Sequence, residues 1–236
     1  FGIDPERIGI IGGSAGGYLT AMAATTSGTK TFDKGDNLQV GSDVKAAVDL
    51  YGLSDLTRIG DDYNDSVKKA HRSAGATEAL WVNGSAVFGG HDGGILANPE
   101  GAQKANPITY ISQTSAPLLL MHGTNDTVVS PSQTDLLFQA LQKHHVPSKR
   151  YLVEGAAHGG IYWNQKEVLD IITTFFDSYL KNRKRLSHVR QPLFLCYFWQ
   201  HGGSFELPPV FVLLLDEQLP EQWLQQLVVP LNRPRI

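Results

Sequence analysis

A short glycine-rich turn near the start of the chain constrains its fold more than any other feature. The apolar residues 8–11 run directly into Gly12, Gly13, Ser14, Ala15, Gly16 and Gly17. This G-x-S-x-G pattern is typical of a sharp turn between a buried strand and a helix. Its flanking residues must be small because strand and helix nearly touch there. The pattern predicts an α/β fold with Ser14 held clear of the sheet on a strained turn, although a glycine-rich turn can also carry an incidental serine.

Two later loops carry residues that could activate a serine. The buried strand expected at 117–121 ends shortly before Asp126, and the strand expected at 149–153 leads to His158. A serine needs a base to become nucleophilic, and the base needs a carboxylate to fix its tautomer. The order serine, acid, histidine, each after a strand, is that of α/β-hydrolases. We therefore expect a triad of Ser14, Asp126 and His158, with Asp49 as a weaker candidate for the acid.

Strands and helices alternate along the first three quarters of the chain. We expect strands at 8–11, 44–51, 118–121 and 149–153, and helices at 17–26, 133–144 and 165–181. Such alternation predicts a parallel sheet covered by helices on both faces.

A polar insertion follows the second expected strand. Residues 54–104 are rich in Gly, Asp and Asn, and we expect them to be irregular apart from a helix near 65–74. They fall at the carboxyl end of the sheet, where open α/β sheets bind ligands. Trp81 and Phe88 in this insertion, and Tyr162 and Trp163 after the histidine loop, are candidates for a substrate pocket. Simple packing of these aromatic residues is the alternative.

Several other polar residues have plainer interpretations. We expect His122 to orient the acid loop through a hydrogen bond, since it lacks partners at metal-ligand spacing. His71 has no partner pattern in the sequence, and Asp61 and Asp62 are interpreted as loop charges.

Five segments carry a resemblance to a known family. They are residues 4–8 (DPERI), 12–17 (GGSAGG), 106–110 (NPITY), 122–126 (HGTND) and 154–159 (EGAAHG). Through them, residues 5–182 resemble the C-terminal half of an α/β-hydrolase of the carboxylesterase or feruloyl/acetylxylan-esterase-like type. The resemblance implies Ser14 as nucleophile, Asp126 as acid and His158 as general base. It also implies an oxyanion contact from the Ala15 backbone N–H and no metal or cofactor.

The sequence departs from this family pattern at its start. The strands that normally precede the serine turn, with an H-G-G-x segment that gives a second oxyanion donor, are not found before residue 8. We therefore expect residues 1–182 to form a partial hydrolase domain whose N-terminal strands are missing. Its edge strand at 8–11 would expose apolar surface and unpaired backbone groups. Loss of one oxyanion donor typically lowers turnover by about 10²–10³.

A second departure lies in the tail, residues 183–236. Its composition changes abruptly, and we expect an atypical extension, either divergent or translated out of frame. Within it, Gln200, His201, Gly202 and Gly203 follow a strand-like segment at 192–199 and resemble the missing oxyanion segment. This alternative implies a circular permutation, although short matches of this kind arise easily by chance.

Composition narrows the remaining possibilities. A net charge of −3 argues against a nucleic-acid partner. Cys196 is the single cysteine, so the chain has neither an internal disulfide nor a cysteine-rich metal site. No apolar run approaches the roughly 18 residues of a membrane span.

Together these features predict a serine hydrolase that cleaves small-molecule carboxylic esters through an acyl-enzyme. The small polar insertion favours short acyl or aromatic-acid esters over long triglycerides. A prolyl-oligopeptidase-type peptidase is the alternative among enzymes, and a catalytically impaired, binding-only remnant is the alternative outside them.

Overall fold

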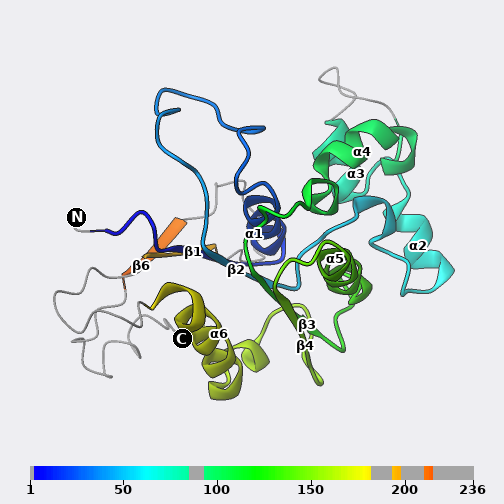
Figure 1. The fold of residues 1–236 in the computed structure, drawn as a ribbon. Helices are drawn as coiled ribbons and strands as arrows, with labels where there is room; N and C mark the ends of the chain where they lie inside the picture. The colour runs from blue at the N-terminus through cyan, green and yellow to red at the C-terminus, as the bar shows by residue number, and fades with distance from the viewer. Residues whose placement is uncertain (1–2, 85–92, 182–192, 198–209, 215–236) are drawn as a thin grey trace, which may run out of the picture.

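Six strands form one sheet, and helices cover both of its faces (Figure 1). The computed structural model describes residues 3–84, 93–181, 193–197 and 210–214, the last two only as paired strands. The strands are β1 (Ile8–Gly13), β2 (Ala46–Leu50), β3 (Leu118–Gly123), β4 (Ser148–Val153), β5 (Leu193–Tyr197) and β6 (Val210–Leu214). The α-helices are α1 (Ala15–Thr25), α2 (Asp65–His71), α3 (Thr77–Asn83), α4 (Pro99–Ala105), α5 (Ser132–Lys143) and α6 (Lys166–Leu180). Short 3₁₀ turns are η1 (Leu56–Arg58), η3 (Ile95–Ala97), η4 (Pro107–Tyr110) and η5 (Ile161–Asn164).

The sheet has the order β4-β3-β2-β1-β5-β6. Neighbouring strands from β4 to β5 run parallel, and β6 runs antiparallel to β5. Every residue of β2 and β3 is buried, as expected for central strands covered on both faces. The predicted α/β fold with a parallel sheet is confirmed.

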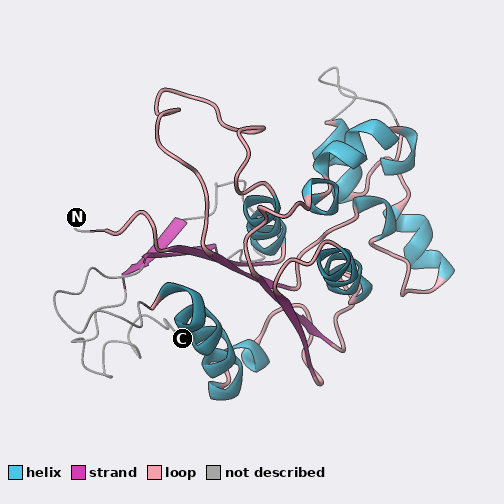
Figure 2. Cartoon of the chain, in the orientation of Figure 1, coloured by secondary structure: helices cyan, strands magenta, loops and turns pink. Residues whose placement is uncertain are grey.

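Helices α1, α5 and α6 form two layers around this sheet (Figure 2). α6 covers one face, where Val48 and Met121 pack with its Phe175 and Phe176. α1 and α5 cover the other face, where Ala47 and Leu120 belong to the core. Adjacent strand residues face opposite layers because side chains alternate along a strand. Because β1 to β4 run parallel, the loops that follow β1, β3 and β4 lie at the same end of the sheet.

The insertion is more ordered than the sequence predicts. The helix expected near residue 65 is present as α2. The expectation that the rest of the insertion is irregular is wrong, because α3 and α4 also form. Each of these helices has seven residues, too few to give a clear apolar period. The Asn64 and Asn98 side chains cap α2 and α4 by accepting from the backbone N–H of Val67 and Gly101. A separate apolar cluster, which includes Leu56 and Ile95, stabilises the insertion.

The edge of β1 also differs from the expectation. Instead of being bare, β1 pairs in parallel with β5, with Ile8 opposite Leu193 and Gly12 opposite Tyr197. An open edge leaves a row of N–H and C=O groups without partners, and here β5, a strand from the tail, supplies those partners. Residues 200–203, in which the sequence predicts a permuted oxyanion segment, lie outside the described residues.

Candidate active site

Ser14 lies on a strained turn between β1 and α1. Its backbone has φ 57° and ψ −121°, a left-handed φ that a residue with a side chain seldom adopts. The Ser14 N–H donates to the carbonyl oxygen of Leu50 at 2.9 Å, which ties the turn to β2. A Cβ atom at Gly12 would overlap the carbonyl oxygen of Gly16, so strand and helix meet with no room for a side chain. The turn is therefore built as the sequence predicts.

The three residues predicted as a triad are linked one to the next by hydrogen bonds. Ser14 Oγ is 2.7 Å from His158 Nε2, and His158 Nδ1 is 2.8 Å from Asp126 Oδ2. The Asp126 carboxylate is buried, and the His158 ring is only 10% exposed. With Nδ1 protonated and donating to Asp126, His158 Nε2 can accept the Ser14 proton. The Ser14 hydroxyl, the His158 imidazole and the Asp126 carboxylate thus form one hydrogen-bonded chain.

The charge of Asp126 is stabilised by several donors. Burial by itself would raise the pKa of Asp126, but hydrogen bonds from His122 and His158 outweigh it and hold the pKa well below its usual value. Oδ1 also accepts from the backbone N–H groups of Val128 and Val129 at 2.9 and 3.0 Å. The Asp126 carboxyl group is thus expected to be ionised at neutral pH.

His122 takes the place that the sequence predicts. Its Nε2 lies 3.2 Å from Asp126 Oδ2 and 3.0 Å from the carbonyl oxygen of Val129, while Nδ1 lies 3.1 Å from Thr134 Oγ1. It therefore joins the acid loop to the start of α5.

The acid and histidine loops are also tied to one another. The Asn125 N–H donates to the Ala156 carbonyl oxygen at 2.9 Å, and the Gly155 N–H donates to Thr124 Oγ1 at 2.8 Å. Because β3 and β4 are hydrogen-bonded neighbours, their two following loops start side by side. The sheet therefore sets the separation of Asp126 and His158.

Tyr51 belongs to this site, although the sequence analysis did not single it out. It directly follows β2 with a left-handed φ of 45°. Its ring lies edge-on to His158, with centroids 4.9 Å apart, and also contacts Trp163 at 4.5 Å. Burial and the charges of Asp126 and Asp49 raise the pKa of Tyr51 to about 12. The sequence could have indicated Tyr51 by its position, because it directly follows the strand that pairs with β1.

Asp49, the weaker candidate for the acid, lies elsewhere. Its Oδ1 accepts from the Gly52 N–H at 2.8 Å, and its side chain is completely enclosed near Gly17 of α1. Among the described residues, its Oδ2 has no hydrogen-bond partner. Burial raises the pKa of Asp49 to about 7. The carboxylate that contacts His158 is that of Asp126.

The four aromatic pocket candidates have different surroundings. Trp81 is about half-exposed and packs against Tyr18, with ring centroids 4.5 Å apart. Tyr162 is 40% exposed. Trp163 instead lies in the core under α6, and its Nε1–H donates to the Ala157 carbonyl oxygen at 3.0 Å. Trp163 therefore braces the histidine loop rather than lining an open surface, and Phe88 lies outside the described residues.

In residues 3–84 and 93–181 with the two paired tail strands, no three His, Cys, Asp or Glu side chains gather as potential metal ligands. None of the helices described here has the length and apolar character needed to cross a membrane.

Known proteins resemble a large part of this chain. The family model BD-FAE matches residues 1–141. The probable carboxylic ester hydrolase LipM of Mycobacterium tuberculosis is 32% identical over 133 residues, which are 56% of this chain and 27% of LipM. The chain therefore spans about a quarter of that relative's length.

Solved structures agree with this comparison. A truncated carbohydrate esterase from gut microbiota has 25% identity and a TM-score of 0.59, covering 76% of this chain and 62% of its own. The bifunctional GH43-CE protein of Bacteroides eggerthii has 27% identity and a TM-score of 0.62, covering 75% of this chain and 22% of its own. The match to the family model spans more than half of the chain, so this chain belongs to the BD-FAE family, and it has an α/β-hydrolase fold.

Proposed function

We propose that this protein is a serine hydrolase of carboxylic esters, with Ser14 as nucleophile, His158 as general base and Asp126 as the acid that orients it. The observation that carries the proposal is the pair of hydrogen bonds from Ser14 Oγ to His158 and from His158 to Asp126, at 2.7 and 2.8 Å. Ester-hydrolase relatives such as LipM support the same reaction class.

In the proposed reaction, Ser14 Oγ attacks the ester carbonyl carbon as its proton passes to His158 Nε2. The C=O π electrons move to the carbonyl oxygen, and the backbone N–H of Ala15, at the start of α1, stabilises that oxyanion. The tetrahedral intermediate then expels the alcohol, which takes the proton from His158. Water, deprotonated by His158, releases the acid from the acyl-enzyme and restores the Ser14 hydroxyl.

We further propose short acyl or aromatic-acid esters, including those on carbohydrates, as the substrates. A carbohydrate esterase among the similar structures favours this class. Among the described residues of the insertion, the large exposed apolar side chains are Leu80, Trp81 and Leu96, a small apolar surface that suits a short acyl chain better than a long one.

The first test is chemical labelling by a fluorophosphonate, which reacts only with an activated serine. The unchanged chain should be labelled and should hydrolyse p-nitrophenyl acetate, and Ser14→Ala should lose both properties. Ser178→Ala, on the exposed side of α6, is the control. Labelling that survives Ser14→Ala would refute the assignment of the nucleophile.

Substrate series separate the alternatives. A p-nitrophenyl ester series should favour acyl chains shorter than about ten carbons, since binding energy grows with buried CH₂ groups only where a pocket holds them. Turnover of peptide amides above that of esters would instead support the prolyl-oligopeptidase-type alternative. A folded chain that neither labels nor turns over would support a binding-only role.

A further inference from the structure

The loop that follows β2 is hydrogen-bonded to the start of α5, close to the loop that carries Asp126. We call residues 54–63 the strap. The backbone N–H groups of Ser54 and Asp55 both donate to Gln133 Oε1 at 2.9 Å. Asp62 Oδ2 accepts from the backbone N–H of Ser132 at 2.8 Å. Although it belongs to the insertion, the strap is therefore fixed to the element that follows Asp126.

One strap residue contacts the acid itself. The Tyr63 hydroxyl donates to the backbone carbonyl oxygen of Asp126 at 3.1 Å. Burial and the nearby charges of Asp126 and Asp62 raise the pKa of Tyr63 far above its usual value, so the phenol stays a neutral donor. The Asp126 side chain is held by His122, Val128 and Val129, whereas this contact holds its main chain.

The strap is in turn braced from behind by α2. The Tyr63 ring stacks on His71 with centroids 6.2 Å apart and planes 22° apart. His71 Nδ1 lies 2.8 Å from Oε1 of the buried Glu78, which fixes the imidazole. A Cβ atom at Gly60 would lie only 3.0 Å from His71 Cδ2, so the strap backbone rests directly on that ring.

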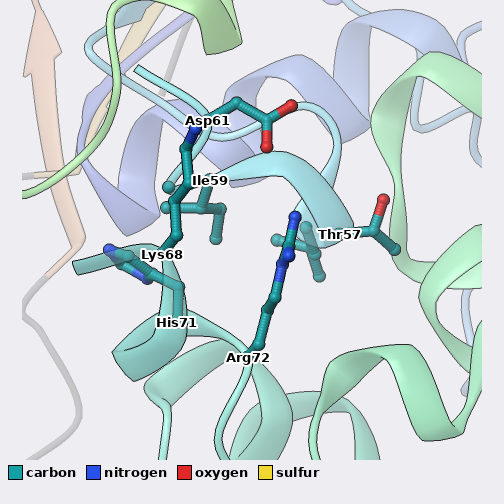
Figure 3. Close-up of a pocket in the computed structure, with 8 residues that line it drawn as sticks. Thr57, Ile59, Asp61, Lys68, His71 and Arg72 are labelled. Atoms are coloured by element: carbon teal, nitrogen blue, oxygen red, sulfur yellow. The ribbon is translucent and has the colours of Figure 1, made fainter. Parts of the chain in front are cut away.

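Figure 3 shows how closely the strap and α2 pack. His71 and Lys68 rise from α2 below Ile59 and Asp61 of the strap. The cavity between them measures about 10 Å³, room for a single water molecule. A strap supported this tightly can hold Tyr63 in one place.

We propose that Tyr63 is a positioning residue for the acid: by anchoring the Asp126 main chain to an insertion braced by His71 and Glu78, it keeps the carboxylate aligned with His158. This inference rests on the proposed function of the triad. It gives the insertion a second role besides its predicted part in the substrate pocket, because His71 of α2 and Glu78 of α3 support the residue that holds the main chain of Asp126.

The test uses Tyr63→Phe, which removes only the hydroxyl. Loss of one such hydrogen bond should lower kcat about two- to tenfold, with little change in KM, since Tyr63 acts on the alignment of the triad rather than on substrate binding. In an Asp126→Asn background the same change should have almost no further effect. Additive losses in that cycle would overturn the inference.

A spectroscopic measurement keeps this test independent of turnover. The proton shared by His158 and Asp126 should give a low-field ¹H NMR signal that moves or broadens in Tyr63→Phe. Tyr110→Phe is the matched control, since its hydroxyl donates to the Lys104 carbonyl oxygen, away from the acid. An unchanged signal in Tyr63→Phe would contradict the inference. Absence of fluorophosphonate labelling in the unchanged chain would instead contradict the proposed function.

Discussion

At the scale of single residues, two buried aspartates show how surroundings decide charge. Asp126 accepts from two histidines and two backbone N–H groups, and its pKa is lowered. Asp49 accepts from one backbone N–H, and burial raises its pKa to about 7. Desolvation acts on both carboxyl groups, but only Asp126 has enough donors to overcome it. The contributions of the two residues to the free energy of unfolding should therefore change in opposite directions as the pH rises.

Asp126→Asn tests the role of the acid. We expect turnover to fall by about 10⁴, because an amide cannot hold His158 in the required tautomer. The folded state should persist by circular dichroism, since the oxygen of the new side-chain amide can still accept from the main chain. Kinetics at pH 7 would measure the loss, and a larger loss from Asp49→Asn would show that the acid is misassigned.

Asp126 should also stabilise the fold at neutral pH. Its pKa is lower in the folded than in the unfolded chain, so this stabilisation is present above the unfolded pKa, about 4. It is lost as the pH falls toward the lowered folded value.

Asp49→Asn tests the opposite case. Because the folded pKa is raised from 3.8 to about 7, the free energy of unfolding should fall as the pH rises between those values and level off above them. The slope from this one group is at most about 1.4 kcal/mol per pH unit. Urea titrations at pH 5 and pH 8 should show that the free energy of unfolding of the variant, relative to that of the unchanged protein, is higher at pH 8 than at pH 5. A difference independent of pH would mean that Asp49 is ionised throughout.

At the scale of elements, the junction of β1 with α1 creates the site. The serine turn needs a glycine on the strand side because the helix backbone approaches it directly, and it needs Ser14 in a left-handed conformation that costs about 1–3 kcal/mol. The core packing of α1 over β1 and β2 offsets this strain. The insertion adds a second junction, since its strap ties β2 to α5.

Gly12→Ala tests the close approach at this junction. The new methyl group would overlap the Gly16 carbonyl oxygen, so strand and helix must separate. We expect a loss of about 1–3 kcal/mol or more in the free energy of unfolding, together with loss of fluorophosphonate labelling. Gly41→Ala, whose methyl group meets only Asp43 Oδ2 at 3.9 Å, should have little effect on thermal unfolding. Equal melting temperatures for both variants would contradict the packing argument.

At the scale of the whole molecule, the tail completes the sheet. β5 covers the edge of β1, and β6 extends the sheet beyond it. In a parallel strand, alternate residues bond to opposite neighbours. Ile8 accepts from Lys45 and Ser14 donates to Leu50, so the even-numbered residues face β2, and Gly9 and Ile11 face β5.

Removal of residues 182–236 tests this edge. In hydrogen exchange, the amides of Gly9 and Ile11 should lose protection, while those of Ile10 and Gly12 stay protected by β2. The shortened chain should also aggregate more readily, because an exposed parallel edge pairs with other chains. Equal protection at Gly9 before and after the deletion would show that β5 does not hold this edge in solution.

The sequence by itself determined the features that depend on local pattern. The strand-turn-helix around Ser14, the order of the alternating elements and the loops of Asp126 and His158 were predictable, because each arises within a short segment. Their meeting at one edge follows from parallel strands, whose carboxyl ends point the same way.

Only the tertiary structure decided the contacts between distant segments. Tyr63 reaches Asp126, Tyr51 packs on His158, and β5 pairs with β1 across more than half of the chain, so none of these contacts leaves a local period. Seven-residue helices such as α3 are likewise stabilised by packing rather than by their own pattern. The sequence therefore predicts which residues follow the carboxyl ends of the strands, whereas only the tertiary structure shows which residues of the insertion and tail pack against them.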